Sequence, residues 1–385
     1  MVGAWVIVEL RELREGDGVR RFETPFGANV WIVARYADVR EVLGDADRFS
    51  NRMAFRPPAD PRSEEEREKA RAGQLLALDP PEHTRLRRLL RPEFTVRRMQ
   101  RLEPRIVEIV DEHLDAMAAA GSPADLVPTF ALPIPSLVIC ELLGVPYADR
   151  AEFQDRTARQ LDLSISLEER MELGRAGRAF MESLVARAKR EPGEDMLGML
   201  VREHADEITD DELVGIGNLL LIAGHETTSN MLGLGTLALL RHPEQLAIVR
   251  DDPAAAAPAV EELLRWLTIV HSGVVRTATA DVELAGHTIP AGDLVVCSLP
   301  TANRDPELIR DPETLDVTRG AAGHVAFGHG VHHCLGAPLA RMEMRIAFPA
   351  LLRRFPGLAL DVPFEEVPFR AFHFIYGLQA LPVRW

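Results

Sequence analysis

One apolar stretch constrains the fold more than any other part of the chain. It runs from Leu213 to Leu240 with a single acidic residue, and the preceding Thr209-Asp-Asp-Glu212 fits the capping-box pattern that begins a helix. A helix of roughly 30 residues is about 45 Å long at 1.5 Å per residue. Because the stretch is apolar on nearly all sides, we expect it to be the buried central helix of a large helical protein.

A polar cluster, Gly224-His-Glu-Thr-Thr-Ser-Asn230, interrupts this helix at its middle and argues against a membrane span. A buried glutamate is costly unless it is paired, solvated or used, so Glu226 is a candidate functional residue. The small residues Ala223 and Gly224 would let a flat ligand approach the backbone, with the hydroxyl of Thr227 beside it. The alternative is a packing glycine and a threonine that bonds its own i−4 carbonyl.

A second constraint is the stretch Phe327-Gly-His-Gly-Val-His-His-Cys334-Leu-Gly336, a glycine-rich loop before a helical pattern. Backbone N–H groups and the helix dipole favour a thiolate at such a position, so we expect the pKa of Cys334 to be lowered. A thiolate there is a nucleophile or a metal ligand. Two alternatives are a cysteine nucleophile with a histidine base and a zinc site formed by His329, His332, His333 and Cys334.

The composition is that of a globular protein with an acidic balance. Hydrophobic residues make up 46% and charged residues 27% of the 385 residues, and the formal net charge of −15 argues against nucleic acid as a partner. Three cysteines without a CxxC pair suit a reducing compartment. The N-terminal region has no signal-peptide pattern, and Met1–Val8 is too short to span a bilayer. We therefore expect a cytoplasmic protein outside the membrane.

Local patterns predict strands first and helices afterwards. Val19–Glu23 and Asn29–Val33 flank Thr24-Pro-Phe-Gly27, which predicts a β-hairpin within a β-rich part covering about residues 1–50. Residues 50–76 are either a surface loop or a flexible lid over a pocket. Amphipathic helices are expected at 36–43, 98–119, 136–144, 149–162 and 166–188, and strands at 274–277, 282–284 and 294–298.

The segment around Asp79 predicts a helix with two basic residues on one face. Asp79 can cap a helix that begins at Pro80-Pro81. His83 and Arg87 are four residues apart and so lie on the same side of that helix. The pair could grip an anionic group, or it could be part of a solvated basic face.

Together these motifs resemble the cytochrome P450 family. The matching motifs are, in chain order, Ala223-Gly-x-Glu-Thr-Thr228, Glu262-x-x-Arg265, Asn303-Arg-Asp-Pro306, Phe327-Gly-x-Gly-x-His-x-Cys334-x-Gly336 and Leu381-Pro-Val-Arg-Trp385. The resemblance implies a mainly α fold with small β-sheets (α+β), a triangular prism that forms a single domain over residues 1–385. Haem would lie between the long central helix and the helix that follows the cysteine loop.

The resemblance also implies roles for individual residues. Cys334 would be the axial thiolate ligand of a b-type haem. Glu226 and Thr227, with water, would deliver protons to dioxygen, and Arg319 would join the structural pair Glu262 and Arg265. Other contacts to the haem or its loop would come from His83, Arg87, Ala223, Gly224, Arg276, Phe327, Gly328, His332 and Gly336.

The implied activity is a haem-thiolate monooxygenase that inserts one oxygen atom of O2 into an apolar organic substrate by hydroxylation or epoxidation. A bacterial secondary metabolite such as a macrolide fits pocket segments near Leu219–Ala223, His271–Val275 and Phe369–Tyr376. The alternatives are a peroxide-driven peroxygenase and a non-enzymatic haem protein, and the intact Glu226 and Thr227 argue against both.

Electrons would come from NAD(P)H through a separate ferredoxin and ferredoxin reductase, and the enzyme would be a monomer. An acidic ferredoxin could dock on a basic patch by electrostatic complementarity. The alternative is that these arginines are scattered by coding bias. The patch would comprise Arg88, Arg91, Arg97, Arg98, Arg341 and Arg345.

Overall fold

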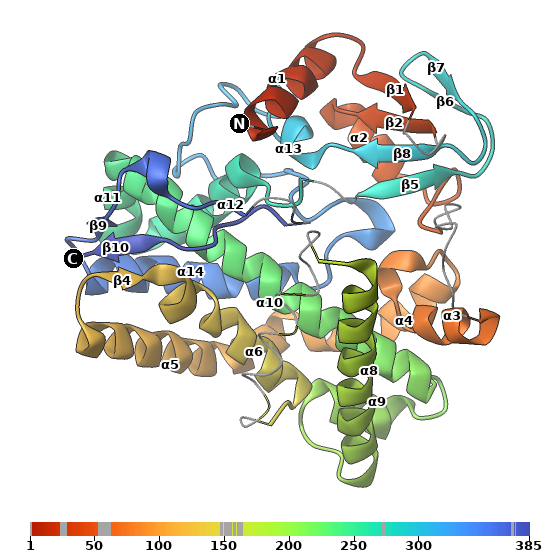
Figure 1. Ribbon diagram of the computed structural model, residues 1–385, viewed down its shortest axis with the longest axis horizontal. Helices are drawn as coiled ribbons and strands as arrows, with labels where there is room; N and C mark the ends of the chain where they lie inside the picture. Colours follow the sequence, from red (N-terminus) through yellow and green to blue (C-terminus); the bar gives the residue numbers. More distant parts are fainter. Residues whose placement is uncertain are drawn as a thin grey trace.

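The computed structural model describes residues 2–23, 29–52, 63–146, 149, 156, 159, 165–271, 274–370, 373 and 375–385. Helix α10 runs diagonally through the middle of the molecule (Figure 1). Helices α6, α8 and α14 pack against it, and α5 packs against α6 and α14. The α-helices are α1 (Val2–Glu15), α2 (Tyr36–Gly44), α3 (Glu64–Arg71), α4 (Glu82–Leu90), α5 (Val96–Ala120), α6 (Pro133–Leu143), α8 (Leu167–Arg190), α9 (Met196–His204), α10 (Asp210–Arg241), α11 (Pro243–Asp251), α12 (Ala256–Leu267), α13 (Leu299–Ala302) and α14 (Ala337–Arg354).

Among the described residues, the strands form three small sheets. The largest has the order β1 (Val19–Glu23), β2 (Asn29–Val33), β8 (Leu294–Cys297), β5 (Val275–Ala278) and β3 (Phe49–Ser50). Only β2 and β8 are parallel within it. The other two sheets are β4 (Ala124–Asp125), β10 (Pro382–Arg384) and β9 (Ala359–Leu360), and β6 (Val282–Leu284) with β7 (His287–Ile289). The mainly α architecture with small sheets is confirmed.

The N-terminal part differs from the prediction of a β-rich region over residues 1–50. It contains the predicted hairpin strands, which pair from Val19 with Val33 to Glu23 with Asn29, but α1 precedes them and α2 follows. In α1, Leu13 and Arg14 are buried while their neighbours Arg11 and Glu12 are exposed, which is a helical period. Arg14 donates hydrogen bonds to the carbonyls of Thr301 and Arg304, which tie α1 to α13. The predicted turn at 24–27 lies outside the described residues.

The central helix begins where its capping box predicted. The Thr209 hydroxyl accepts from the N–H of Glu212, and the Glu212 carboxylate accepts from the N–H of Thr209. Close packing explains two of its glycines. A Cβ at Gly215 would lie 1.8 Å from the carbonyl oxygen of Ala72, and one at Gly235 would lie 2.4 Å from the Phe348 ring.

Most of the remaining predicted elements are present. The helices predicted at 98–119, 136–144 and 166–188 correspond to α5, α6 and α8, whereas most of 149–162 lies outside the described residues. Within residues 50–76, Ser63 caps α3 in a capping box. Its hydroxyl accepts from the N–H of Glu66, and the Glu66 carboxylate accepts from the N–H of Ser63. In the described part of the chain, no helix is both long and apolar enough to cross a membrane.

Candidate active site

The cysteine loop is shaped by its glycines and its own backbone hydrogen bonds. Gly328 and Gly330 adopt φ angles of 73° and 72°, a region that favours glycine. A Cβ at Gly330 would also lie 2.4 Å from the Leu43 carbonyl oxygen, so the loop rests directly on the end of α2. The N–H of Cys334 donates to the carbonyl of Phe327 at 2.9 Å, which closes the loop on itself.

The Cys334 thiol does not have the lowered pKa that the sequence predicted. Burial raises its pKa, and this outweighs the backbone N–H groups of Gly336 and Ala337 and the positive charges of Arg87 and Arg341. The side chain is nevertheless accessible, so a ligand can reach it. A thiol in this setting suits a metal ion, because the ion itself supplies the charge that stabilises the thiolate.

The histidines of the loop point in different directions. His329 lies against Gly44 of α2, His332 turns toward His83 of α4, and His333 is exposed. Within the described ranges, no three His, Cys, Asp or Glu side chains are grouped so that they could hold a metal ion. The zinc alternative therefore finds no support.

The four residues expected to bind anions come together from three elements. His83 and Arg87 lie on α4, Arg276 on β5 and His332 in the cysteine loop. The rings of His83 and His332 are 4.0 Å apart. Burial lowers the pKa of all four residues, and for His332, lowered to about 3, the nearby His83 and Arg276 add to the effect.

This cationic cluster favours an anion over a solvated basic face. His83 is 1% exposed, and its Nδ1 atom has no hydrogen-bond partner in the described structure. The Asn51 side-chain amide donates to Nε2 of His332, which leaves that histidine neutral. An anion would supply the missing partner and the countercharge that the buried Arg276 needs.

Asp79 does not cap α4 as predicted, because Pro81 occupies the N-cap position without a side-chain hydrogen bond. The Asp79 carboxylate instead accepts hydrogen bonds from the Ser50 hydroxyl and the Asn51 N–H. It thereby fixes Asn51 beside His332. The role of Asp79 is to support the cluster from its edge.

One face of α10 is accessible in an otherwise buried helix. Three residues at intervals of four lie on this face: Leu219 and Thr227 are half-buried, and Ala223 between them is exposed. The Thr227 hydroxyl donates to the Ala223 carbonyl at 2.8 Å, the i−4 bond considered from the sequence. Its oxygen lone pairs remain available to accept a further hydrogen bond. A flat apolar group could therefore lie against this face, in contact with a small residue and a hydroxyl.

Gly224 lies elsewhere on the helix. A Cβ on this residue would be 2.8 Å from the Ile139 side chain of α6. This contact favours the packing explanation over a direct contact with a ligand. The small size of Gly224 lets α10 approach α6, and the expected contact of Gly224 with the haem stays a prediction.

Glu226 is fully buried and has a partner that the sequence analysis did not identify. Its Oε2 accepts hydrogen bonds from Arg370 at 2.8 Å and from Asn230 at 3.3 Å, whereas Oε1 has no hydrogen-bond partner in the described structure. Burial by itself raises the pKa of Glu226, but the adjacent His225 and Arg370 outweigh it and lower the pKa. Burial lowers the pKa of His225, so Arg370 carries the positive charge that holds Glu226 ionised.

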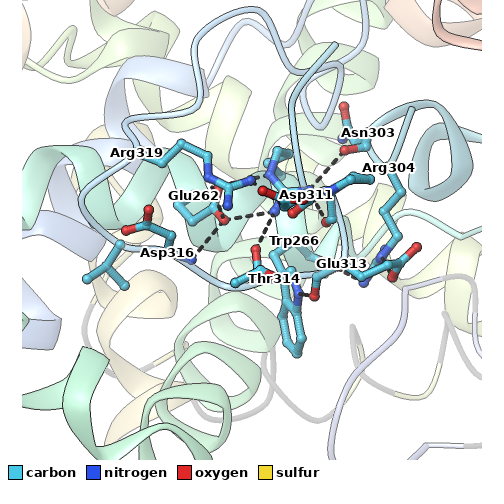
Figure 2. A network of polar contacts seen from close by, with 12 residues as sticks. Glu262, Trp266, Asn303, Arg304, Asp311, Glu313, Thr314, Asp316 and Arg319 are labelled. Carbon is cyan, nitrogen blue, oxygen red and sulfur yellow. Dashed lines mark hydrogen bonds and ion pairs between the residues drawn. The ribbon is translucent and has the colours of Figure 1, made fainter. Parts of the chain in front are cut away.

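A buried polar network surrounds the glutamate and arginine of α12. Arg265 binds both carboxylate oxygens of Glu262 at 2.8 Å and also donates to the carbonyls of Asn303, Pro312 and Thr314. Arg319 lies 3.9 Å from the Glu262 carboxylate, as the sequence analysis proposed. Figure 2 shows how this network holds the loop from Asn303 to Arg319 against α12.

The residues present fit a haem with two carboxylate side groups. Such a group needs three contacts. They are a thiol that a ligand can reach, the accessible helix face with Ala223 and Thr227, and the cationic cluster of two histidines and two arginines. Together they define a haem-thiolate protein.

Comparison with known proteins agrees with this class. The family model described as "Cytochrome P450" matches residues 256–363. Cytochrome P450 FAS1 of Rhodococcoides fascians is 51% identical over 98% of this chain and 95% of its own length. Among solved structures, CYP105P1 in complex with filipin I has a TM-score of 0.91 and 42% identity, covering 98% of this chain and 95% of that chain. P450 StaH from biosynthesis of the glycopeptide antibiotic A47934 has a TM-score of 0.87 and 47% identity, covering 97% and 96%.

The chain belongs to the cytochrome P450 family. It is a P450 monooxygenase, and the family implies haem iron, dioxygen and a small-molecule substrate.

Proposed function

We propose that this enzyme hydroxylates or epoxidises an apolar secondary metabolite, with electrons from NAD(P)H delivered by a separate ferredoxin and ferredoxin reductase. The observation that carries the proposal is the accessible face of α10, where apolar Leu219 and Ala223 lead to the hydroxyl of Thr227. When bound, the haem supplies the chemistry of oxygen activation. Cys334 holds its iron, and His83, Arg87, Arg276 and His332 bind its propionates.

Thr227 and Glu226 have different roles in proton delivery. The Thr227 hydroxyl donates to Ala223 and can accept from a water on the accessible face. Glu226 is ionised, and its Oε1 has no hydrogen-bond partner in the described structure, so it can accept a hydrogen bond from a water that leads toward Thr227. In Thr227→Ala, electron consumption should continue while product falls and hydrogen peroxide rises. Thr227→Ser is the matched control, and tight coupling in the alanine variant would contradict this role.

Two segments that we expect to line the substrate pocket contact each other. The His271 ring stacks on Tyr376 with ring centres 4.5 Å apart, and the Phe369 ring is nearly parallel to Tyr376 at 5.8 Å. The Tyr376 N–H donates to the Ile269 carbonyl at 2.9 Å, which joins the segments. Residues 272, 372 and 374, also expected near the pocket, lie outside the described residues. This aromatic wall supports a sizeable apolar substrate with few polar groups.

A screen by spin-state shift tests the substrate class. The panel contains macrolides of the size of filipin I, which the CYP105P1 complex holds, and carrier-free glycopeptide precursors as the second class. The macrolides should produce the larger high-spin shift at equal concentration. A shift confined to the peptides would redirect the proposal while leaving the monooxygenase assignment unchanged.

We propose a docking patch for ferredoxin that is centred on two of the six arginines expected from the sequence. Ion pairs engage four of the six arginines: Arg88 with Glu207, Arg98 with Glu93, and Arg341 and Arg345 with Glu261. Arg91 and Arg97 are exposed, and no ion pair engages either of them in the described part of the chain. These two arginines are therefore the proposed docking site for an acidic partner.

Charge reversal separates docking from general charge effects. Arg91→Glu with Arg97→Glu should raise the apparent KM for ferredoxin and weaken its dependence on salt. Arg20→Glu with Arg21→Glu, on exposed positions of β1, is the matched control. Equal kinetics of both double variants at low salt would contradict the assignment.

We also propose that the enzyme acts as a monomer in the cytoplasm and that residues 1–385 form one domain. Three free cysteines suit a reducing compartment. One hydrophobic cluster includes residues from Leu75 to Val383, and a second includes residues from Val19 to Val325. The two clusters overlap along the sequence, which supports one folding unit. Sedimentation at micromolar concentration should give one species of monomer mass, and a dimer would overturn the proposed state.

A further inference from the structure

Glu261 precedes the network glutamate Glu262 on α12 but has different partners. Its carboxylate receives two hydrogen bonds from Arg341, at 2.7 Å to Oε1 and 2.8 Å to Oε2. His324 lies 3.2 Å away and Arg345 3.6 Å away. His324 precedes the cysteine loop, and Arg341 follows it on α14. Glu261 thus holds both ends of the segment that carries Cys334.

The contacts of His324 assign the tautomer of its neutral ring. Its Nδ1 atom accepts a hydrogen bond from the N–H of Ala326 at 3.2 Å. In a neutral imidazole the proton is then on Nε2, which donates to Glu261. The His324 side chain is buried. This hydrogen bond fixes the chain three residues before Phe327.

Arg341 extends the connection into the loop itself. Its guanidinium lies over the Phe327 ring, 4.6 Å from the ring centre, within the range of a cation–π contact. The Phe327 carbonyl accepts the hydrogen bond from the Cys334 N–H. Glu261, Arg341, Phe327 and Cys334 therefore form a continuous series of contacts.

The carboxylate at the start of this series is firmly ionised. Burial by itself raises the pKa of Glu261, but the hydrogen bonds from His324 and Arg341 outweigh it and bring the pKa to about 2. Both side chains of the main ion pair are partly buried, so solvent screens it less than a surface pair. A two-point contact between guanidinium and carboxylate also fixes the orientation of Arg341.

We propose that Glu261 is a positioning residue for the Cys334 thiolate. Glu261 fixes Arg341 on Phe327 and balances the charge of Arg341. It thereby sets the reduction potential of the bound haem iron. The inference rests on the haem-thiolate assignment. It also gives Arg341 a role in the protein interior in place of docking.

The test compares midpoint potentials of four haem-loaded proteins without ferredoxin: wild type, Glu261→Gln, Arg341→Gln and the double variant. Removing the carboxylate leaves Arg341 uncompensated, so the potential should become more positive. Removing the guanidinium should make it more negative, because less positive charge faces the thiolate. The double variant should return close to the wild-type potential, since the two changes cancel.

The controls separate positioning from structural damage. Asp115→Asn breaks an ion pair of 2.7 Å with Arg354 at the other end of α14, and its potential should equal that of the wild type. Glu261→Asp should recover most of the wild-type value. Unfolding temperatures identify variants that fail to fold. Arg341→Lys keeps the charge without the two-point contact and tests positioning separately: a shifted potential supports it, and an unchanged potential overturns it.

Shifts of opposite sign in the two single variants support the proposal. Shifts of the same sign, or unchanged potentials, overturn it. A wild-type protein that lacks the red-shifted thiolate–CO band would instead overturn the haem-thiolate assignment, so the two failures are distinguishable.

Discussion

Arg370 donates a hydrogen bond of 2.8 Å from its guanidinium to the carboxylate of Glu226, a residue 144 positions earlier in the chain. The Glu226 side chain is buried and the Arg370 side chain nearly so. Arg370 also donates to the Leu378 carbonyl at 3.1 Å. The pair therefore joins the C-terminal segment, with its pocket residues Phe369 and Tyr376, to the middle of the central helix.

Removing Arg370 should be strongly destabilising. Arg370→Met leaves a buried carboxylate without its countercharge, which costs about 3–5 kcal/mol. Adding Glu226→Gln should restore part of the loss, because the unpaired charge is gone. Urea unfolding of the haem-free proteins measures both. Arg384→Met, which removes an exposed arginine 3.9 Å from Asp361 in the same terminal segment, should cost less than about 1 kcal/mol.

The same pair makes the stability depend on pH. The pKa of Glu226 is lowered in the folded protein, so its stabilising contribution is complete above the unfolded pKa of about 4.3. It is lost as the pH falls through the lower folded pKa. The difference in unfolding free energy between wild type and Glu226→Gln should therefore shrink as the pH is lowered from 6 to about 4 and below. A difference that grows on acidification would contradict an ionised Glu226.

The α12 network predicts a graded response. Arg265→Met removes five hydrogen bonds and leaves Glu262 in the interior with only the longer contact to Arg319 as an ion pair among the described residues, so we expect a loss of more than about 3 kcal/mol. Arg319→Met should cost clearly less, because Arg319 is 3.9 Å from Glu262 and more exposed. Thermal unfolding of both variants decides the order. An equal or reversed order would mean that Arg319 is the main partner of Glu262.

The cationic cluster predicts how firmly haem is held. Arg276→Gln and His83→Ala each remove one charge-assisted contact to a propionate, a loss of about 1.5–3 kcal/mol, or roughly 10–100-fold in affinity. The rate of haem transfer to an excess of a competing apoprotein measures this loss. Arg91→Gln, on an exposed arginine next to α4, is the control and should leave the rate unchanged. Haem retention equal to the wild type in both cluster variants would place the propionates elsewhere.

The parts of the molecule set by local pattern were predictable from the sequence. The capping box of Thr209 and Glu212 located the start of α10, and alternating residues located both hairpin strands. The Glu262, Arg265 and Arg319 group was also anticipated, because the motif spacing fixes the first two.

The missed features depend on contacts between distant parts of the chain. Arg370 is far from Glu226 in sequence, and nothing local marks it as the partner. The packing of Gly224 against Ile139 of α6 likewise depends on a contact that the local pattern does not show. The sign of the Cys334 pKa shift was wrong because desolvation depends on the packed structure, whereas the loop motif shows only the N–H groups that oppose it. One signal was present in the sequence: Glu261 stands next to Glu262, and this second glutamate could have indicated a further set of ion-pair contacts beside the Glu262 network.

The central claim is that Cys334 ligates the haem iron as a thiolate. The most direct measurement is the Soret band of the purified, haem-loaded protein after reduction under carbon monoxide. We predict the strongly red-shifted band of a thiolate–CO complex, and its loss in Cys334→His while haem remains bound. A folded, haem-loaded wild-type protein without that band would contradict the claim.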